Sequence, residues 1–331
     1  MHSIETKSLS KSFGDLKAVD DISFAVEEGE IFGFLGPNGA GKSTTMMILT
    51  TLLKPTSGQA LVSGFDVRAN PKEVRQRIGY VQQETTVDEY LTGRENLILQ
   101  ARLNHIPKED IDKNIDEVLD LIELSDKQHE AVVTYSGGMR KRLDIAGGLL
   151  HRPKVLFLDE PTVGLDIQTR RKIWEYIKKI HTEFDMTIFL TTHYMEEADQ
   201  LCDRIGIIDS GKIQVIDSPE NMKNAMGKEV ISLVIENGEA HAKFIEELEK
   251  IELVNKINQD NEKITLFASK GTEVIPRIFQ ISSQLKIKIK SISLTSPTLD
   301  DVFISYTGHE IRDEGGFNRK KEHAKMKRLR A

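Results

Sequence analysis

The sequence predicts an α/β fold in which a mainly parallel sheet with helices forms a first domain and a small α+β domain follows. Three short apolar runs, at residues 31–35, 155–158 and 187–190, have the length and composition of buried strands. Helix-compatible stretches separate them. Apolar strands with helices between them are typical of a parallel sheet that is covered on both faces. A chain of 331 residues suffices for two domains.

The elements of the first domain can be assigned in order. A turn-like acidic stretch at 27–30 precedes the first strand, and a helix is expected over residues 44–53. Proline and glycine in the cluster 54–58 should end that helix. A second helical stretch, around 173–180, separates the other two apolar runs.

The sequence becomes helical in a segment that we assign to a helical subdomain at about 86–150. Thr92-Gly93-Arg94-Glu95 has the spacing of a helix capping box. An amphipathic face follows, with apolar residues at spacings of three and four: Ile111, Ile115, Val118, Leu119 and Ile122. Such faces are usually part of a core, and the pattern leaves open which side of this insert meets another protein.

The first domain should end at about residue 220. Apolar runs at 205–208 and 213–216 flank Asp209-Ser210-Gly211-Lys212, which predicts a closing hairpin. The second domain, 228–310, has the β-α-β-β-α-β order of a ferredoxin-like domain. Its expected elements are strand 230–235, helix 240–251, strands 253–257 and 263–268, helix 273–285, strand 287–294 and a closing helix at 297–306.

Composition and charge are those of a globular chain with a basic end. The formal net charge is −7, and residues 318–331 hold seven Lys or Arg and one Glu. We assign 311–331 to a basic tail and give it no function. No apolar run approaches the roughly 20 residues that cross a bilayer, and the single cysteine, Cys202, fits a reducing cytosol.

A glycine-rich loop carries the strongest chemical signal. Gly36-Pro37-Asn38-Gly39-Ala40-Gly41-Lys42-Ser43, followed by Thr44, lies between a predicted strand and a predicted helix. Glycines let backbone N–H groups surround phosphate oxygens, and the helix start adds its positive end. Lys42 would neutralise the β- and γ-phosphates, and the Ser43 hydroxyl would bind Mg²⁺. These residues predict a nucleoside triphosphate site with ATP and Mg²⁺ as cofactors.

Two carboxylates follow the apolar run at 155–158. Ligands of parallel sheets bind at the carboxyl ends of the strands, where Asp159 and Glu160 would lie. Asp159 can hold the metal ion directly or through water, and Glu160 can accept a proton from the attacking water. A strand that ends in Asp-Glu is a weak signal alone. Combined with the glycine-rich loop, it indicates an ATPase.

The segment Tyr135-Ser136-Gly137-Gly138-Met139-Arg140 adds a family resemblance. A Ser-Gly-Gly run at a helix start is a second anion-binding arrangement. With the preceding motifs, it makes the chain closely resemble the nucleotide-binding subunits of ATP-binding cassette (ABC) transporters. The resemblance implies that Ser136, Gly137 and Gly138 face the ATP held by an opposite subunit. Hydrolysis would then require a head-to-tail homodimer that encloses two ATP molecules.

Four further positions match this family in order and spacing. Gln82 matches the glutamine that touches Mg²⁺ and reports to the membrane partner, and Asp166 belongs to the Gly164-Leu165-Asp166 loop that crosses the dimer. His193 matches the histidine that contacts the γ-phosphate. Phe13 stands where the family stacks an aromatic ring on adenine. Taken singly, these residues would more often be a surface amide, a loop residue or a core side chain.

One branch of the family shares further features. Residues 135–146 and 298–309 resemble those of daunorubicin-resistance ATP-binding proteins, although Tyr135, Met139 and Val163 depart from the commonest family pattern. The resemblance implies an exporter motor that energises a separate multi-span permease at the cytoplasmic face of the cell membrane. Its substrate would be a drug, a lipid or another hydrophobic molecule.

Two other readings remain open. A cassette ATPase of ribosomes or nucleic acid would be expected to have two fused cassettes, a long coiled coil or a basic face. This chain has one phosphate-binding loop and an acidic first domain, so we expect no nucleic-acid partner. The second domain could sense an effector, or it could simply stabilise a dimer.

Overall fold

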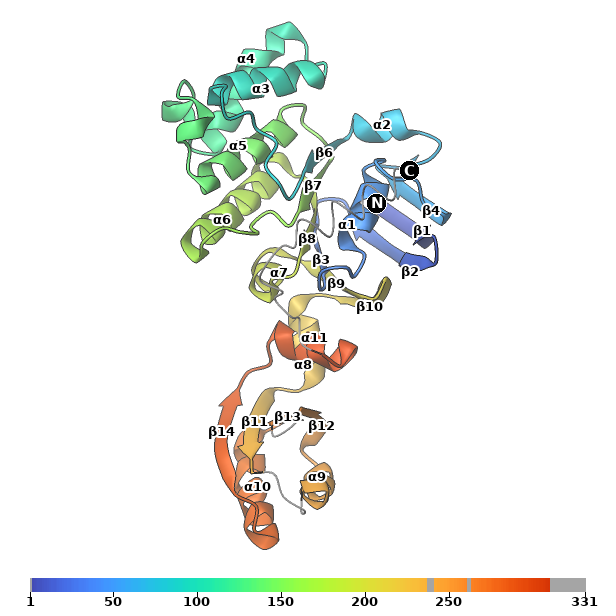
Figure 1. The fold of residues 1–331 in the computed structure, drawn as a ribbon, viewed down its shortest axis with the longest axis vertical. Helices are drawn as coiled ribbons and strands as arrows, with labels where there is room; N and C mark the ends of the chain where they lie inside the picture. Colours follow the sequence, from blue (N-terminus) through green and yellow to red (C-terminus); the bar gives the residue numbers. More distant parts are fainter. Residues whose placement is uncertain (1, 237–240, 261–262, 310–331) are drawn as a thin grey trace.

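The computed structural model describes residues 2–236, 241–260 and 263–309. A helical part with α3, α4 and α5 lies at one end, mixed α/β structure lies in the middle, and the C-terminal domain lies at the other end (Figure 1). Within the described residues, no helix combines the length and apolar character needed to span a bilayer.

The central sheet has six strands in the order β10-β9-β3-β8-β7-β6. Its strands are β3 (Ile31–Leu35), β6 (Ile78–Val81), β7 (Val155–Asp159), β8 (Thr187–Thr192), β9 (Arg204–Asp209) and β10 (Lys212–Asp217). All neighbouring pairs are parallel except β9 and β10. The predicted parallel sheet and its closing hairpin are confirmed. β3, β7 and β8 have no exposed residue, which explains their continuous apolar sequence.

A second, antiparallel sheet at the N-terminus was not predicted. It orders its strands as β2-β1-β4-β5, with β1 (His2–Phe13), β2 (Leu16–Glu27), β4 (Ser57–Val62) and β5 (Phe65–Asp66). Register shifts interrupt the pairing of β1 with β2, and Ser8 has φ of 47°. These irregularities break the two-residue alternation that would mark the strand in the sequence.

The two sheets of the first domain share one apolar core. Phe24 of β2 packs on Phe32 and Phe34 of β3 with ring centroids 5.7 and 5.5 Å apart, and Phe189 of β8 joins the cluster. Between the sheets, α1 (Lys42–Leu49) contributes buried Met46, Ile48 and Leu49 to the same core. The helix expected to reach residue 53 ends at Leu49, because Thr51 adopts a left-handed φ of 65°.

Helices between the strands cover the sheet and build the insert. These are α2 (Pro71–Arg75), α3 (Gly93–Leu103), α4 (Lys108–Leu121), α5 (Gly137–Leu149), α6 (Ile167–Phe184), α7 (Met195–Leu201) and α8 (Pro219–Met226), with the 3-10 turns η1 (Ser125–Lys127) and η2 (Val132–Thr134). The capping box at Thr92 and Glu95 is confirmed. Ile115, Val118, Leu119 and Ile122 are buried, as their spacing predicts.

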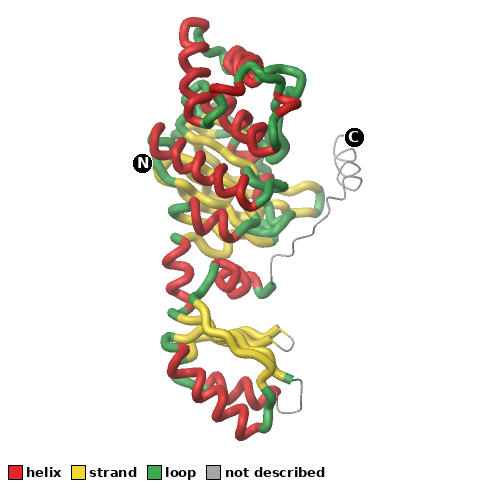
Figure 2. The backbone as a smooth tube through the Cα atoms, turned by 90° about the vertical axis from the view of Figure 1, so that its left-hand side faces the viewer, coloured by secondary structure: helices red, strands yellow, loops and turns green. Residues whose placement is uncertain are grey.

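The C-terminal domain has the predicted β-α-β-β-α-β order. Its elements are β11 (Glu229–Ile235), α9 (His241–Glu249), β12 (Val254–Asp260), β13 (Lys263–Ala268), α10 (Gly271–Leu285) and β14 (Ile289–Thr295). The strands form one antiparallel sheet in the order β12-β13-β11-β14, and α9 and α10 lie together on one of its faces (Figure 2). The predicted α/β fold with a small α+β domain is confirmed.

The closing helix α11 (Leu299–Thr307) joins the second domain to the first. Leu299, Val302 and Phe303 are buried in the core that also contains Leu201 of α7 and Met222 of α8. We keep the bounds 1–220, 228–310 and 311–331 as a proposal. The basic tail and the predicted helix start at residue 240 lie outside the described residues.

Candidate active site

The glycine-rich loop is held at the rim of the central sheet, between β3 and α1. Gly36 N donates to Thr192 O at 3.2 Å, at the end of neighbouring β8. A Cβ on Gly36 would lie 2.2 Å from Ile208 O, and one on Gly41 would lie 2.4 Å from Ala18 O. Gly41 also has φ of 107°, which disfavours residues other than glycine. Close packing against two neighbouring segments therefore requires these two glycines.

The tip of the loop remains open while its ends are fixed. Ala40 is buried, and its carbonyl accepts from Gly211 N at 3.0 Å in the β9–β10 turn. Pro37 is half-buried, whereas Asn38 and Gly39 are exposed. This arrangement leaves backbone groups accessible where the sequence predicts phosphate binding.

Lys42 points into the loop that precedes it. Its ammonium group donates to Gly36 O at 2.7 Å and to Pro37 O at 3.0 Å, and it lies 3.2 Å from Glu160 Oε1. Burial lowers the pKa of Lys42, and the negative charge of Glu160 opposes that effect. The lysine is thus a positive charge inside the loop, close to the candidate base.

Asp159 connects the loop to the end of β8. Its Oδ1 accepts from Ser43 Oγ at 3.2 Å and from Thr191 Oγ1 at 2.5 Å. Burial raises the pKa of this carboxyl group, and the hydrogen bonds from Thr191 and Ser43 oppose the shift. A hydroxyl and a carboxylate in contact, at the edge of a phosphate-binding loop, fit the oxygen donors that Mg²⁺ prefers.

Glu160 is fixed between two cationic or hydrogen-bonding side chains. Its backbone has φ of 45°, and its N–H donates to both the carbonyl and the hydroxyl oxygen of Thr191 at 3.1 Å. Its carboxylate contacts Lys42, and Oε2 lies 3.1 Å from His193 Nδ1. Burial alone would raise the pKa of Glu160, but His193 and Lys42 outweigh it and lower the pKa. The carboxylate therefore stays ionised, as a proton acceptor requires.

Lys42, Ser43, Asp159, Glu160 and His193 thus form one group, which we call the phosphate-loop cluster. It brings together residues from three places in the sequence. Thr191, which sequence reasoning missed, holds the two carboxylates in place. Its only sequence signal is a polar residue near the end of an apolar strand, directly before Thr192 and His193.

Ser136, Gly137 and Gly138 lie in a second group, together with Asp166. Ser136 Oγ caps α5 by accepting from Met139 N at 3.3 Å. Asp166 caps α6 through Thr169, whose N and Oγ1 donate to it at 3.0 and 2.6 Å. A Cβ on Gly138 would lie 2.4 Å from Thr169 Cγ2. The starts of α5 and α6 therefore form one packed surface, which we call the α5–α6 unit.

The two groups are not joined within the chain. In the described residues, no hydrogen bond or ion pair connects Ser136–Gly138 or Asp166 with the loop at 36–43. Gln82, just after β6, is exposed and makes no described side-chain bond to Ser43 or Asp159. Phe13 ends β1 half-buried, with Lys11 Nζ 5.0 Å from its ring centroid. The roles of these residues remain predictions.

Comparisons with known proteins agree with this geometry. A family model described as "ABC transporter" matches residues 19–163, and one described as "ATP-binding protein DrrA1-3-like, C-terminal domain" matches 218–307. The chain is 38% identical, over 94% of both chains, to the daunorubicin/doxorubicin resistance ATP-binding protein DrrA of Streptomyces peucetius. It is 34% identical to the linearmycin resistance ATP-binding protein LnrL of Bacillus subtilis (strain 168), over 94% of this chain and all of that one.

The chain belongs to the ATP-binding proteins of ABC transporters. The resemblance to the daunorubicin-resistance branch is confirmed, and the cassette is an ATPase. It superposes on the dimeric post-hydrolysis state of the ATP-binding cassette MJ0796 bound to ADP and Pi, with a TM-score of 0.58 and 27% identity. That alignment covers 65% of this chain and 98% of the other. Nucleotide binding by this cassette therefore follows from both its family and its fold.

Proposed function

We propose that this cassette drives export: it hydrolyses ATP as a head-to-tail homodimer and energises a separate multi-span permease at the cytoplasmic face of the membrane. The observation that carries the proposal is the phosphate-loop cluster, which joins a buried lysine, two carboxylates and a histidine at one rim of the sheet. Two relatives are named for resistance to daunorubicin/doxorubicin and to linearmycin, and a third is named for Nod factor export, which supports export of a drug or another hydrophobic molecule.

The chain's own residues suit phosphoryl transfer to water. Lys42 and backbone N–H groups of residues 38–43 would bind the β- and γ-phosphates, and His193 would contact the γ-phosphate. Ser43 and Asp159 would hold Mg²⁺, with Gln82 as a third oxygen donor, and the ion would neutralise charge on the phosphates. Glu160 would accept the proton of the attacking water once Lys42, which now contacts Glu160, binds phosphate oxygens instead.

The dimer explains why the two groups are separate in one chain. Ser136 and Gly137, at the start of α5, are exposed, and the start of a helix can bind an anion. We infer that this unit covers the phosphate-loop cluster of a second copy, so that each ATP contacts two subunits. The relative MJ0796 is described as dimeric, which supports the arrangement.

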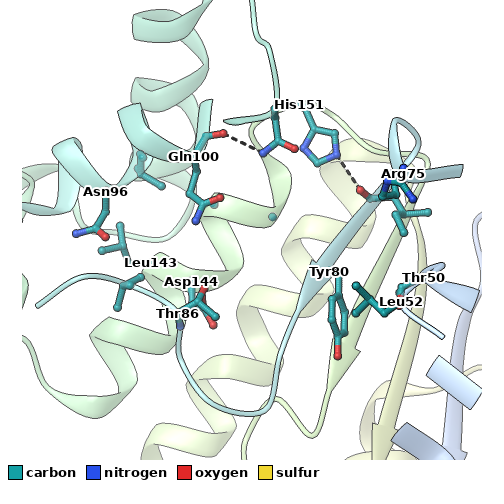
Figure 3. A pocket seen from close by; sticks show the side chains of 16 residues that line it. Thr50, Leu52, Arg75, Tyr80, Thr86, Asn96, Gln100, Leu143, Asp144 and His151 are labelled. Atoms are coloured by element: carbon teal, nitrogen blue, oxygen red, sulfur yellow. Dashed lines mark hydrogen bonds between the residues drawn. The ribbon is translucent and has the colours of Figure 1, made fainter. Parts of the chain in front are cut away.

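A groove between the central sheet and the helical insert suits the permease. Its volume is about 270 Å³, and its lining includes Leu52, Tyr80, Thr86, Leu97, Asp144 and His151 (Figure 3). Leu52 in this lining is 60% exposed, and α3, which contributes Leu97 to the lining, carries Leu99 and Leu103 with exposures of 45% and 64%. Exposed apolar side chains on elements that line a groove indicate a protein-binding surface. We propose that a cytoplasmic segment of the permease docks here.

The test separates docking from hydrolysis. A double substitution, Leu99→Glu with Leu103→Glu, should leave the ATPase activity of the purified chain within about twofold and abolish its co-purification with a multi-span membrane protein. Phe279→Glu in α10, at a residue that is 46% exposed, is the matched control and should retain the permease. Association of the wild-type chain with ribosomes instead of the permease would refute the export proposal.

A further inference from the structure

The helix α5 carries a buried charged pair that the proposed reaction does not use. Lys141 and Asp144 are 4% and 8% exposed, and Lys141 Nζ lies 3.9 Å from Asp144 Oδ2. Burial lowers the pKa of Lys141 and raises the pKa of Asp144, and each charge opposes the shift of the other. Such a pair gains little over apolar residues of the same size, so stability alone does not explain it.

Both members of the pair bind the loop that follows β6. Lys141 Nζ donates to Gln82 O at 2.6 Å and to Gln83 O at 3.3 Å. Asp144 Oδ1 accepts from Thr86 N at 3.2 Å and from Thr86 Oγ1 at 2.7 Å. Residues 82–86 contain no helix or strand, so these contacts hold an irregular segment at both its ends.

The same helix begins with Ser136, Gly137 and Gly138. Lys141 lies five residues after Ser136, a distance of about 7.5 Å along a helix. The helix is therefore a short rigid link between the α5–α6 unit and the segment that begins with Gln82. Two parts of the proposed ATP site that are far apart in the sequence are joined through one pair of side chains.

Asp144 also lies at the groove proposed for the permease. Asp144 and Thr86 both line it, and Figure 3 shows them next to each other below Leu143. Asp144 Oδ2 is buried and has no hydrogen-bond partner among the described residues. A partner in the groove would consequently lie against the same contacts that fix the 82–86 segment.

We propose that Lys141 and Asp144 are positioning residues that fix the 82–86 segment to α5, so that Gln82 and Ser136–Gly138 move as one body. The inference rests on the proposed function, because it assumes that Gln82 and Ser136 act at ATP. Displacement of a reacting group by about 1 Å can slow catalysis by about a hundredfold. Loss of the pair should therefore lower kcat and leave ATP binding to Lys42 and its loop intact.

The decisive variant replaces both charges by apolar side chains, Lys141→Met with Asp144→Leu. Each single substitution leaves one buried charge alone and should lower the melting temperature, whereas the double substitution should restore it. In the double variant we expect kcat for ATP hydrolysis to remain about tenfold to a hundredfold below wild type, with an unchanged dissociation constant for ATP. Recovery of both the melting temperature and kcat would overturn the proposal, because it would show a purely structural pair.

Two further variants complete the test. Lys141→Arg, which keeps the donors, should recover most of kcat. Lys179→Met is the matched control, because Lys179 Nζ also reaches a carbonyl, Leu121 O, at 3.4 Å and a carboxylate, Glu183, at 3.9 Å. Lys179→Met should keep the wild-type kcat. A tenfold loss of kcat in this variant would contradict the proposal, because it would show that the effect is not specific to Lys141.

Gln82→Ala, assayed in parallel, separates this inference from the proposed function. A wild-type kcat for Gln82→Ala would refute the role assigned to Gln82. A reduced kcat for Gln82→Ala, together with a wild-type kcat for the double variant, would refute the positioning role of the pair alone.

Discussion

The phosphate-loop cluster and the α5–α6 unit are built in opposite ways. In the first, Lys42, Asp159 and Glu160 are each no more than 6% exposed, and they bind one another or neighbouring backbone groups. In the second, Ser136, Gly137 and Asp166 are exposed, and their hydrogen bonds to described residues cap two helices. A charged group can be buried only when it is paired, so the cluster needs its partners within the chain. The α5–α6 unit has no such requirement, and we propose that a second subunit supplies its partner.

Among substitutions that test this difference, replacement of Glu160 should lower kcat the most. Glu160→Gln keeps the shape of the side chain and removes its basicity, so kcat should fall by about 10²- to 10⁴-fold. ATP binding should persist, because Lys42 and the loop are intact, and a long-lived ATP-bound dimer should accumulate. Steady-state hydrolysis and size-exclusion chromatography measure the two outcomes. Turnover near the wild-type rate would refute the assignment of Glu160 as the base.

A substitution in the α5–α6 unit should lower the rate of ATP hydrolysis without changing the affinity for ATP. Gly138→Ala would force Cβ against Thr169 Cγ2 and should lower kcat by about tenfold to a hundredfold, with ATP affinity unchanged. Gly147→Ala on the same helix is the control, because its Cβ would meet only Gln100 Cγ, at 3.4 Å. If Gly138→Ala instead weakened ATP binding in the monomer, the two groups would not be functionally separate.

Substitution of Lys42, in contrast, should weaken the binding of ATP itself. Lys42→Ala removes charged hydrogen bonds to phosphate worth about 1.5–3 kcal/mol each, which corresponds to a loss of affinity of at least about tenfold. Titration with a fluorescent nucleotide measures this change. Lys72→Ala, at an exposed position in α2, should retain the wild-type affinity. Equal affinity of Lys42→Ala and wild type would contradict the proposed phosphate contact.

The smallest expected effect concerns pH. His193 and Lys42 lower the pKa of Glu160, so the carboxylate stays ionised to a lower pH than an ordinary glutamate. The stability that these contacts add to the folded state is therefore lost only as the pH falls through this lowered pKa. His193→Ala removes one of these contacts and should move the acid limb of kcat/KM to higher pH. His193→Gln, which can still donate a hydrogen bond, should move it less. An unchanged acid limb in His193→Ala would show that His193 does not tune Glu160.

The sequence failed where structure depends on irregular backbone or on distant partners. Strand β1 was missed because its register shifts hide the alternation of buried residues. The helix after the glycine-rich loop was predicted four residues too long, because its apolar composition continues past the left-handed Thr51. Thr191, Lys141 and Asp144 had only weak local signals, which did not indicate what each side chain contacts. Their importance depends on hydrogen bonds to residues 31 to 59 positions away.

The sequence alone determined the class of fold, the glycine-rich loop and the order of the motifs around it. These features depend on local physics: apolar runs form buried strands, and only glycine tolerates the close approaches at Gly36 and Gly41. Tertiary structure decided which of those motifs meet. It brought Glu160 between Lys42 and His193, and it tied the start of α5 to the loop that follows β6. The reason is that burial of charge is satisfied by neighbours in space, whichever part of the chain supplies them.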